Sequence, residues 1–298
     1  MSQVTEQNVK QCCAVFYGSD LARWLLGDSF HPGGTHLTDR LAQLTRLTRD
    51  SRVLDVAAGQ GTSALHLVQS FGCEVVGVDL SEDNVKVATE EASIRGVANR
   101  VSFRLADAET LPFEADTFDA ILCECAFCTF PNKQTAAGEF FRALKPGGRL
   151  GLSDLTKTAD PLLEFDGLLS WIACIGDAQP VESYSETLRL AGLTVEDIED
   201  HSYALAEMVR RIQGRLLGVE IAAGLKKLAF PNVSFSDAKR FAQAALSSVK
   251  NGKLGYALIE AVKPRLIAPV RSTPQQNDPI SQSPRIHPTS ELRLADRP

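Results

Sequence analysis

The stretch V-L-D-V-A-A-G-Q-G, from Val53 to Gly61, decides the fold of this chain. Its first half alternates apolar residues around one carboxylate, Asp55, which predicts a short buried strand. The second half is a turn of small residues, after which Thr62 or Ser63 offers an N-cap to a segment with helical apolar spacing. A strand, a tight glycine turn and a helix form the first half of a mononucleotide-binding βαβ unit, in which the backbone approaches a ligand closely.

Two further predicted strands end in an acidic residue. The run 74–80 places Asp79 at its carboxyl end, where a carboxylate can accept both hydroxyls of a ribose, and the run 101–107 closes with Asp107. The G-x-G-x-x-G pattern of a pyrophosphate site is incomplete, and Asp55 is a poor neighbour for a pyrophosphate but a good one for a cation. The sequence therefore favours a nucleoside that carries positive charge over NAD.

With carboxylates at three successive strand ends, the sequence resembles the class I S-adenosylmethionine-dependent methyltransferases. The resemblance implies S-adenosylmethionine as the cofactor and implies that Asp107 accepts hydrogen bonds from the adenine amino group. The candidate cofactor-binding residues are Asp55, Ala57, Gly59, Gly61, Asp79, Leu80, Asp107, Ala108 and Cys123.

We expect an α/β fold, with a Rossmann-like, seven-stranded, mostly parallel methyltransferase sheet, an N-terminal helical lid and a helical insertion. Later strands are expected at 149–154, 194–201 and 256–262, the first of them after a K-P-G-G turn at 145–148. The expected segments are 1–50 for the lid, 51–202 for the core, 203–255 for the insertion, 256–263 for the last core strand and 264–298 for a tail. That tail holds half of the 14 prolines and no aromatic residue, so we expect it to be disordered.

Composition narrows the class of protein. The chain of 298 residues is long enough for one large α/β domain. Its net charge of −6 lacks the excess of positive charge that nucleic-acid-binding proteins use to contact phosphates. No apolar run reaches the length of a bilayer, and the N-terminus lacks the layout of a signal peptide. Seven cysteines, an odd count, indicate free thiols rather than a disulfide framework. We therefore expect a cytoplasmic enzyme with a small-molecule partner and neither a nucleic-acid nor a membrane partner.

The fourth predicted strand, 117–125, ends in a cluster of cysteines. Cys123, Cys125 and Cys128 form a C-x-C-x-x-C pattern at the carboxyl end of this strand, where parallel sheets bind their ligands. The Asn or Asp followed by two prolines that marks amino-methyltransferases is absent there, which argues against methylation of a base or an amide.

The run D-A-I-L-C-E-C-A-F-C-T-F-P-N-K-Q, with the later W-I-A-C-I-G, resembles the arsenite methyltransferase family. The resemblance implies that Cys125 and Cys174 bind arsenic as the substrate. It also implies that an N-terminal cysteine completes the site, and Cys12 and Cys13 are the two candidates.

Trivalent arsenic is thiophilic, so thiolates suit it better than carboxylates or imidazoles. Two or three thiolates would hold arsenic as a pyramid with its lone pair directed at the sulfonium methyl group, and the enzyme would supply alignment and a dry site. Two alternatives stay open. One is a small-molecule C-, O- or S-methyltransferase with incidental cysteines. The other is a non-enzymatic thiol-rich module that binds or senses a metal such as zinc through Cys123, Cys125, Cys128 and Cys174, although C-x-C-x-x-C is tighter than usual zinc spacing.

Overall fold

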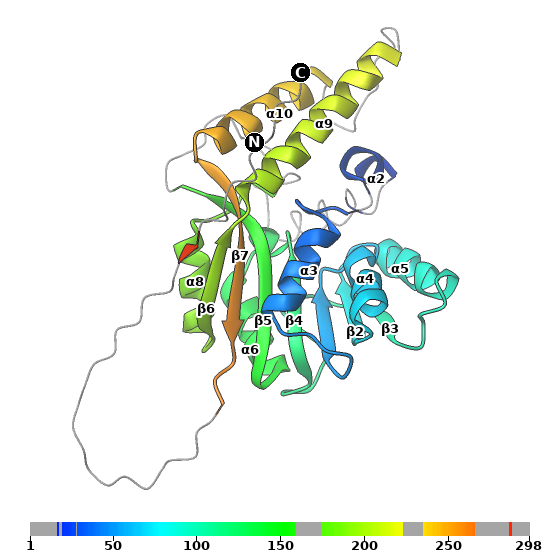
Figure 1. The fold of residues 1–298 in the computed structure, drawn as a ribbon, viewed down its shortest axis with the longest axis vertical. Helices are drawn as coiled ribbons and strands as arrows, with labels where there is room; N and C mark the ends of the chain where they lie inside the picture. The colour runs from blue at the N-terminus through cyan, green and yellow to red at the C-terminus, as the bar shows by residue number, and fades with distance from the viewer. Residues whose placement is uncertain are drawn as a thin grey trace, which may run out of the picture.

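The structure, a computed structural model, describes residues 17, 20–27, 29–158, 174–222, 235–265 and 286–287. Within these residues the strands form one sheet in the order β3-β2-β1-β4-β5-β7-β6-β8 (Figure 1). The strands are β1 (Arg52–Val56), β2 (Glu74–Asp79), β3 (Val101–Leu105), β4 (Phe118–Glu124), β5 (Leu144–Lys157), β6 (Thr194–Asp200), β7 (Leu254–Val262) and β8 (Ile286–His287). The first five pair in parallel, and β7 runs antiparallel to both β5 and β6. The predicted Rossmann-like, mostly parallel methyltransferase sheet is confirmed.

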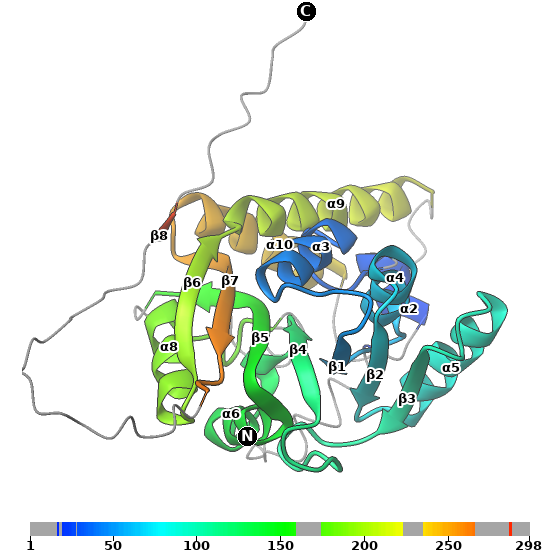
Figure 2. The ribbon, with the colours of Figure 1, turned by 60° about the horizontal axis from the view of Figure 1, so that its bottom comes forward.

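Helices cover both faces of the sheet. The described helices are α2 (Asp20–Leu26), α3 (Thr35–Leu44), α4 (Thr62–Phe71), α5 (Glu82–Ile94), α6 (Lys133–Ala143), α8 (Val181–Leu190), α9 (Ser202–Ala222) and α10 (Phe235–Lys250), with a 3-10 turn, η1 (Phe127–Thr129). The helices α3, α4 and α5 lie on one face, and α6 and α8 lie on the other (Figures 1 and 2). The helices α2, α9 and α10 lie beyond the carboxyl ends of the parallel strands, on the side where such sheets bind ligands (Figure 1).

The stretch from Val53 to Gly61 folds into the strand and glycine turn that its sequence predicts. Val53, Leu54 and Val56 are at most 1% exposed, because β1 lies between β2 and β4 with helices on both faces. Gly61 ends the turn with a φ of 84°, a left-handed conformation that glycine adopts without steric cost, and α4 starts at the next residue. This geometry leaves the N-terminus of α4 directed at the carboxyl edge of the sheet.

The predicted N-terminal lid divides into two parts. The helix α3 packs on α4, β5 and β7 and buries Leu37 and Leu41, so it belongs to the helical layer of the core rather than to a lid. The helix α2 lies over the carboxyl edge. The predicted helices at 9–17 and 162–174 lie outside the described residues except for Tyr17 and Cys174.

Two arginines connect α2 to its surroundings. Arg23 donates through Nε to Oε1 of Gln60, in the turn between β1 and α4, at 2.9 Å. Arg215 of α9 donates through Nη1 to the carbonyl oxygens of Trp24 and Leu25, at 2.9 and 2.8 Å. Contacts therefore run from the inserted helix α9 through α2 to the glycine turn.

Several predicted strand boundaries are wrong: β3 ends at Leu105 rather than at 107, and β5 and β7 are longer than predicted. The strand β5 spans Leu144–Lys157 instead of 149–154, and its bounds include the predicted turn at 145–148. The strand β7 begins at Leu254, two residues before the predicted start. The reason is pairing, because the antiparallel ladder between β5 and β7 continues to Lys157 opposite Leu254. Backbone hydrogen bonds between β5 and β7 determine where these strands end, and the residue types near the strand ends do not reveal such pairing.

The predicted disordered tail is also wrong in part. Ile286 and His287 form β8, which pairs in parallel with Ile198 and Glu199 of β6. The free edge of β6 presents unpaired backbone groups, so a passing segment can pair there without building a core of its own. The remainder of 264–298, apart from Pro264 and Arg265, lies outside the described residues.

Truncation after Arg265 is expected to lower the melting temperature by only about 2–4 °C, because it removes two residues of edge pairing. Scanning calorimetry of the full-length and truncated proteins measures this difference. A loss of ten degrees or more would contradict the expectation and show that the tail stabilises the fold beyond the β8 pairing.

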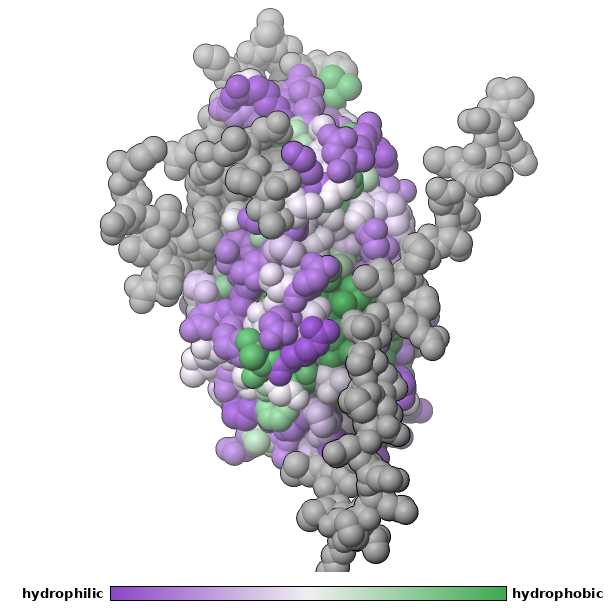
Figure 3. All heavy atoms as spheres, turned by 90° about the vertical axis from the view of Figure 1, so that its left-hand side faces the viewer, coloured by the Kyte–Doolittle hydropathy of each residue, from purple (hydrophilic) through white to green (hydrophobic). Residues whose placement is uncertain are grey.

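The face that carries α8 and β6 is mostly hydrophilic, with apolar residues gathered in one area near its centre (Figure 3). None of the helices within the described ranges is long and apolar enough to span a bilayer.

Candidate active site

The strand β1 supplies a buried carboxylate, one oxygen of which has no partner among the described residues. Asp55 is 2% exposed, and its Oδ2 has no hydrogen-bond partner among the described residues. Burial, followed by the negative charges of Glu124 and Asp79, raises the pKa of Asp55 well above its usual value. A buried polar oxygen without a partner is costly, so this position calls for a ligand that brings a hydrogen-bond donor.

Asp79 fixes the next part of the site. Its Oδ2 accepts from the backbone N–H of Gly59 at 2.8 Å, and its Oδ1 accepts from the backbone N–H of Ser81 at 2.8 Å and from Nδ2 of Asn84 at 3.2 Å. Burial raises its pKa, and these hydrogen bonds oppose that rise. Asp79 thus connects the glycine turn to the start of α5 and holds its carboxylate at the carboxyl end of β2.

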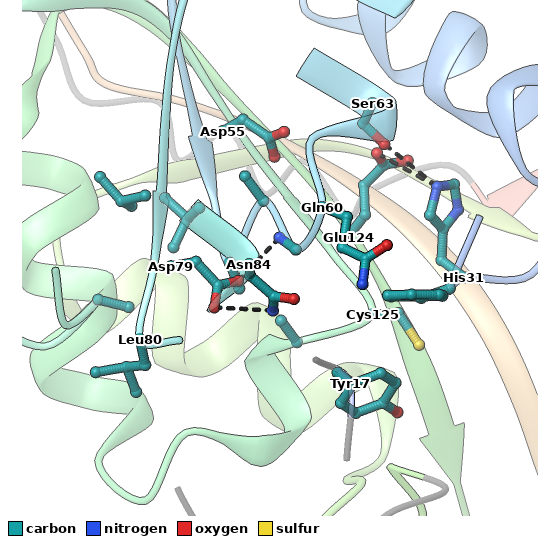
Figure 4. Close-up of a pocket in the computed structure, with 18 of the residues that line it drawn as sticks. Tyr17, His31, Asp55, Gln60, Ser63, Asp79, Leu80, Asn84, Glu124 and Cys125 are labelled. Carbon is teal, nitrogen blue, oxygen red and sulfur yellow. Dashed lines mark hydrogen bonds and ion pairs between the residues drawn. The ribbon is translucent and has the colours of Figure 1, made fainter. Parts of the chain in front are cut away.

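One pocket collects most of the predicted cofactor residues. Asp55, Ala57, Gly59, Asp79, Leu80, Asp107 and Ala108 line it, together with Cys125 (Figure 4). Leu80 is 42% exposed, and Asp107 Oδ1 accepts from the backbone N–H of Glu109 at 2.9 Å. The strand-end carboxylates therefore lie around a single ligand site.

Two predicted cofactor residues do not line this pocket. Cys123 is fully buried in the hydrophobic core, because the regular β4 strand packs it among apolar neighbours of β1 and β5. A Cβ added at Gly61 would collide with Phe103 and Ala88. The absence of a side chain at this glycine therefore lets the turn pack closely on β3 and α5.

The structure brings Cys125 and Cys174 together. Both have left-handed backbone conformations, with φ values of 53° and 60°, which end β4 and turn the later segment toward it. The Sγ of Cys174 lies 3.6 Å from the carbonyl oxygen of Cys125 and 3.2 Å from the hydroxyl oxygen of Tyr17. Cys125 lines the cofactor pocket, whereas Cys174 is 2% exposed behind it.

Hydrogen bonds converge on Cys174. The thiols of Cys125 and Cys128 lower the pKa of Cys174 well below its usual value, and the Tyr17 hydroxyl lowers it further against the effect of burial. The pKa of Cys125 rises because its thiol donates to Cys174 and because it is buried, and that of Cys128 rises mainly through burial. The Cys174 thiol in turn donates to the carbonyl oxygen of Cys125, so these groups form one hydrogen-bonded cluster.

Cys128 is the thiol that the arsenic interpretation did not include. It is 1% exposed, and its backbone N–H donates to Oδ2 of Asp154 at 2.8 Å. Burial, followed by the charge of Cys174, raises the pKa of Asp154 to about 7. Cys128 reaches the cluster because η1 turns the chain back after β4, and only the C-x-C-x-x-C pattern indicated it. Cys12 and Cys13 lie outside the described residues.

The thiol cluster is not a preformed metal site. In the part of the chain that the structure describes, no group of three or more His, Cys, Asp or Glu side chains is arranged to hold a metal ion.

Several pocket residues were not among the predicted cofactor-binding residues. They include Tyr17, Phe30, His31, Asn84, Glu124 and Phe130. His31 precedes α3 in an H-P-G-G loop, and Glu124 is the last residue of β4, between Cys123 in the strand and Cys125 after it, so spacing alone did not place either in the cofactor pocket.

The comparisons with known proteins agree with this geometry. Residues 47–187 match a family described as a methyltransferase domain. The 27-O-demethylrifamycin SV methyltransferase of Amycolatopsis mediterranei is 28% identical, over 83% of this chain and 94% of that protein. The ubiquinone/menaquinone biosynthesis C-methyltransferase UbiE of Ectopseudomonas mendocina is 30% identical, over 76% of this chain and 86% of that protein. The crystal structure of the cyclase SpnF has a TM-score of 0.70 and 26% identity, and the match covers 88% of this chain and 97% of that one.

A glycine turn with carboxylates at successive strand ends defines a nucleoside-binding enzyme of the Rossmann-like class. The chain belongs to the class I S-adenosylmethionine-dependent methyltransferase family. S-adenosylmethionine is the methyl donor, and the acceptor is a small molecule. The unpaired oxygen of Asp55 and the acidic pocket fit this cationic cofactor.

Replacing Asp79 with alanine is expected to weaken S-adenosylhomocysteine binding by about 1–3 kcal/mol, because the ribose loses its acceptor and the Gly59 amide loses its partner. Titration calorimetry measures the change, and the wild-type protein should bind S-adenosylhomocysteine more tightly than NAD. Tighter binding of NAD would overturn this assignment of the pocket.

Proposed function

We propose that the methyl acceptor is trivalent arsenic bound by the thiols of Cys125 and Cys174. The supporting observation is that Cys125, Cys128 and Tyr17 lie around the Cys174 sulfur and lower its pKa, beside a cysteine that lines the cofactor pocket. A thiolate is the form that binds soft metals and metalloids, and burial normally disfavours it. The hydrogen bonds from Cys125, Cys128 and Tyr17 offset that penalty.

In the proposed reaction, Cys125 and Cys174 bind and orient arsenic, and S-adenosylmethionine donates the methyl group. Arsenite brings hydroxyl groups, two of which leave as water when the two cysteine sulfurs bind. The Cys125 thiol supplies one of the protons and, because Cys174 binds as the thiolate, solvent supplies the other. Cys125 and Cys174 then orient the arsenic lone pair toward the cofactor pocket. S-adenosylmethionine supplies the methyl group, whose carbon forms the new bond to arsenic while the electron pair of its former bond remains on sulfur. The protein needs no general base for this step, because the lone pair carries no proton.

The test is an assay of the reduced protein with arsenite and methyl-labelled S-adenosylmethionine. We expect label in methylated arsenic, separated by chromatography, with S-adenosylhomocysteine formed in equal amount. A count of reactive thiols before and after addition of arsenite should show two thiols protected. Failure to methylate arsenite at any thiol concentration would overturn this acceptor.

A second candidate is a carbon or oxygen nucleophile of a largely apolar organic molecule. One relative is named for C-methylation and another for a 27-O-demethyl substrate. Aromatic side chains of Tyr17, Phe30 and Phe130 line the pocket and would suit a ring. Turnover of a hydroquinone without turnover of arsenite would favour this candidate.

A further inference from the structure

Cys174 lies in a segment, 174–179, that forms neither a helix nor a strand of the sheet. Its own backbone has a φ of 60°, a left-handed conformation that is unfavourable for a residue with a side chain. Local backbone preference therefore does not explain why its sulfur lies beside Cys125. Contacts from other elements are needed to hold the segment in this place.

The end of the segment farther from Cys174 is fixed to β5 and α8. The backbone N–H of Lys157 donates to the carbonyl oxygen of Gln179 at 3.2 Å, and the backbone N–H of Gln179 donates to the hydroxyl oxygen of Tyr184 at 3.0 Å. The Nζ of Lys157 also lies 3.3 Å from the carbonyl oxygen of Gly176. These contacts anchor the segment on the side of the sheet that carries α8.

Lys133 supplies a contact from the opposite side of the segment. It is the first residue of α6, and its side chain is only 7% exposed. Its Nζ donates to Oδ2 of Asp177 and, at 3.1 Å, to the carbonyl oxygen of Phe130. Phe130 directly follows η1 and lines the cofactor pocket. One ammonium group therefore joins the loop after β4 to the segment that carries Cys174.

The place of Lys133 is unfavourable unless this bridge forms. A buried ammonium group is costly without a charged partner, and the N-terminus of a helix is the end at which a positive charge is disfavoured. The contacts with Asp177 and Phe130 offset both costs. Asp177 is 40% exposed, so water can solvate its carboxylate when Lys133 is replaced. Loss of the bridge should therefore loosen this junction and leave the rest of the fold intact.

We propose that Lys133 is a positioning residue of the acceptor site, and that its bridge from Phe130 to Asp177 keeps the Cys174 sulfur beside Cys125. Without the bridge the segment opens, and an acceptor bound to both cysteines loses one of its two sulfur contacts. The inference rests on the proposed function only in treating these two cysteines as the acceptor site.

The test measures how fast each cysteine is alkylated by iodoacetamide, in protein without arsenite or methyl donor, with peptide mass spectrometry as the readout. A buried thiol reacts when the structure opens around it, so the rate reports local opening. Lys133→Met keeps an unbranched side chain and removes the ammonium group. We expect Cys174 to react about 10- to 100-fold faster in this variant, with the rate at the fully buried Cys73 unchanged within about twofold.

Asp177→Asn removes the other charge of the same bridge from a partly exposed position. It should accelerate alkylation of Cys174 by about 3- to 10-fold, because the hydrogen bond from Lys133 to Phe130 remains. Combining it with Lys133→Met should add little to the effect of Lys133→Met alone, since the two replacements remove one shared contact.

Lys263→Met is the matched control. The Lys263 side chain is 11% exposed, and its Nζ donates to Oδ1 of Asp116 at 2.6 Å and to the carbonyl oxygen of Leu144 at 2.8 Å. This bridge is of the same kind, but Asp116 precedes β4, so it lies at the amino end of that strand. Lys263→Met should leave the ratio of the alkylation rates at Cys174 and Cys73 unchanged.

Equal acceleration at Cys174 and Cys73 in Lys133→Met would show a role in overall stability alone and would overturn the proposal, as would an unchanged rate at Cys174. If Lys133→Met fails to fold, Asp177→Asn decides by the same two criteria. Arsenite is absent from this measurement, so arsenite methylation can fail while the selective opening of Cys174 persists. The two proposals therefore fall separately.

Discussion

Cys174→Ser is expected to reduce arsenite methylation by ~100-fold or more while S-adenosylhomocysteine binding stays unchanged. Serine keeps the approximate volume of cysteine but forms no thiolate at neutral pH. The three hydrogen bonds that converge on the Cys174 sulfur would then stabilise a neutral hydroxyl that does not bind arsenic. Loss of one arsenic–sulfur bond also misdirects the lone pair, and misplaced reacting atoms alone cost about 100-fold in rate.

Cys125→Ser should have an effect of the same size, since it removes the thiol that lines the cofactor pocket. Cys73→Ser is the matched control. Cys73 is fully buried, its thiol donates to the carbonyl oxygen of Leu67 at 3.6 Å, and burial raises its pKa to about 11. It directly precedes β2, at the amino end of that strand, whereas the thiol cluster follows the carboxyl end of β4. Its replacement should affect stability at most.

The three variants are compared in one assay with arsenite and labelled methyl donor, with calorimetric binding of S-adenosylhomocysteine as the check on folding. Equal activity of all three would show that the cysteine cluster is incidental to catalysis. The organic acceptor would then replace arsenic as the substrate class.

Gly61→Ala is expected to destabilise the protein by about 3 kcal/mol. An added Cβ would lie 2.7 Å from Cζ of Phe103 and 2.9 Å from Cβ of Ala88, closer than real Cβ atoms come to their neighbours. The backbone at this position also has a φ of 84°, which strains any residue with a side chain. Urea unfolding at constant pH measures the loss, and cofactor affinity should fall with it because the turn must shift.

Gly96→Ala separates the two causes. Gly96 has a φ of 68°, yet an added Cβ there meets no atom within 4 Å. This control should therefore show only the backbone strain, about 1 kcal/mol. The same loss in both variants would mean that the contact of the turn with Phe103 and Ala88 does not limit stability.

The cofactor half of the site was predictable because it depends on two local regularities. Alternating apolar residues place β1, β2 and β3, and parallel pairing brings their carboxyl ends to one edge, so Asp55, Asp79 and Asp107 meet without further information. The same reasoning failed for Cys123. A residue one position earlier than Glu124 points to the opposite face of the strand, into the core.

The acceptor half depends on irregular backbone that spacing does not reveal. Cys125 and Cys174 come together through left-handed conformations that non-glycine residues seldom adopt, and only the family resemblance paired them. The N-terminal contacts of Tyr17 and His31 join residues more than 30 positions apart along the chain, which periodicity cannot detect. For the same reason the pairing of β8 with β6 was missed.

The contacts from Arg215 through α2 to Gln60 have a consequence for turnover and for evolution. Because α2 lies over the carboxyl edge and Arg23 holds it to the glycine turn, we expect loss of the hydrogen bond between Arg23 and Gln60 to speed release of the spent nucleoside. Since Arg215 anchors α2 from a helix outside the sheet, we expect replacement of Arg215 to alter the same rate. The rate of nucleoside exchange could then change through α2 and α9 without any change in the sheet residues that line the pocket.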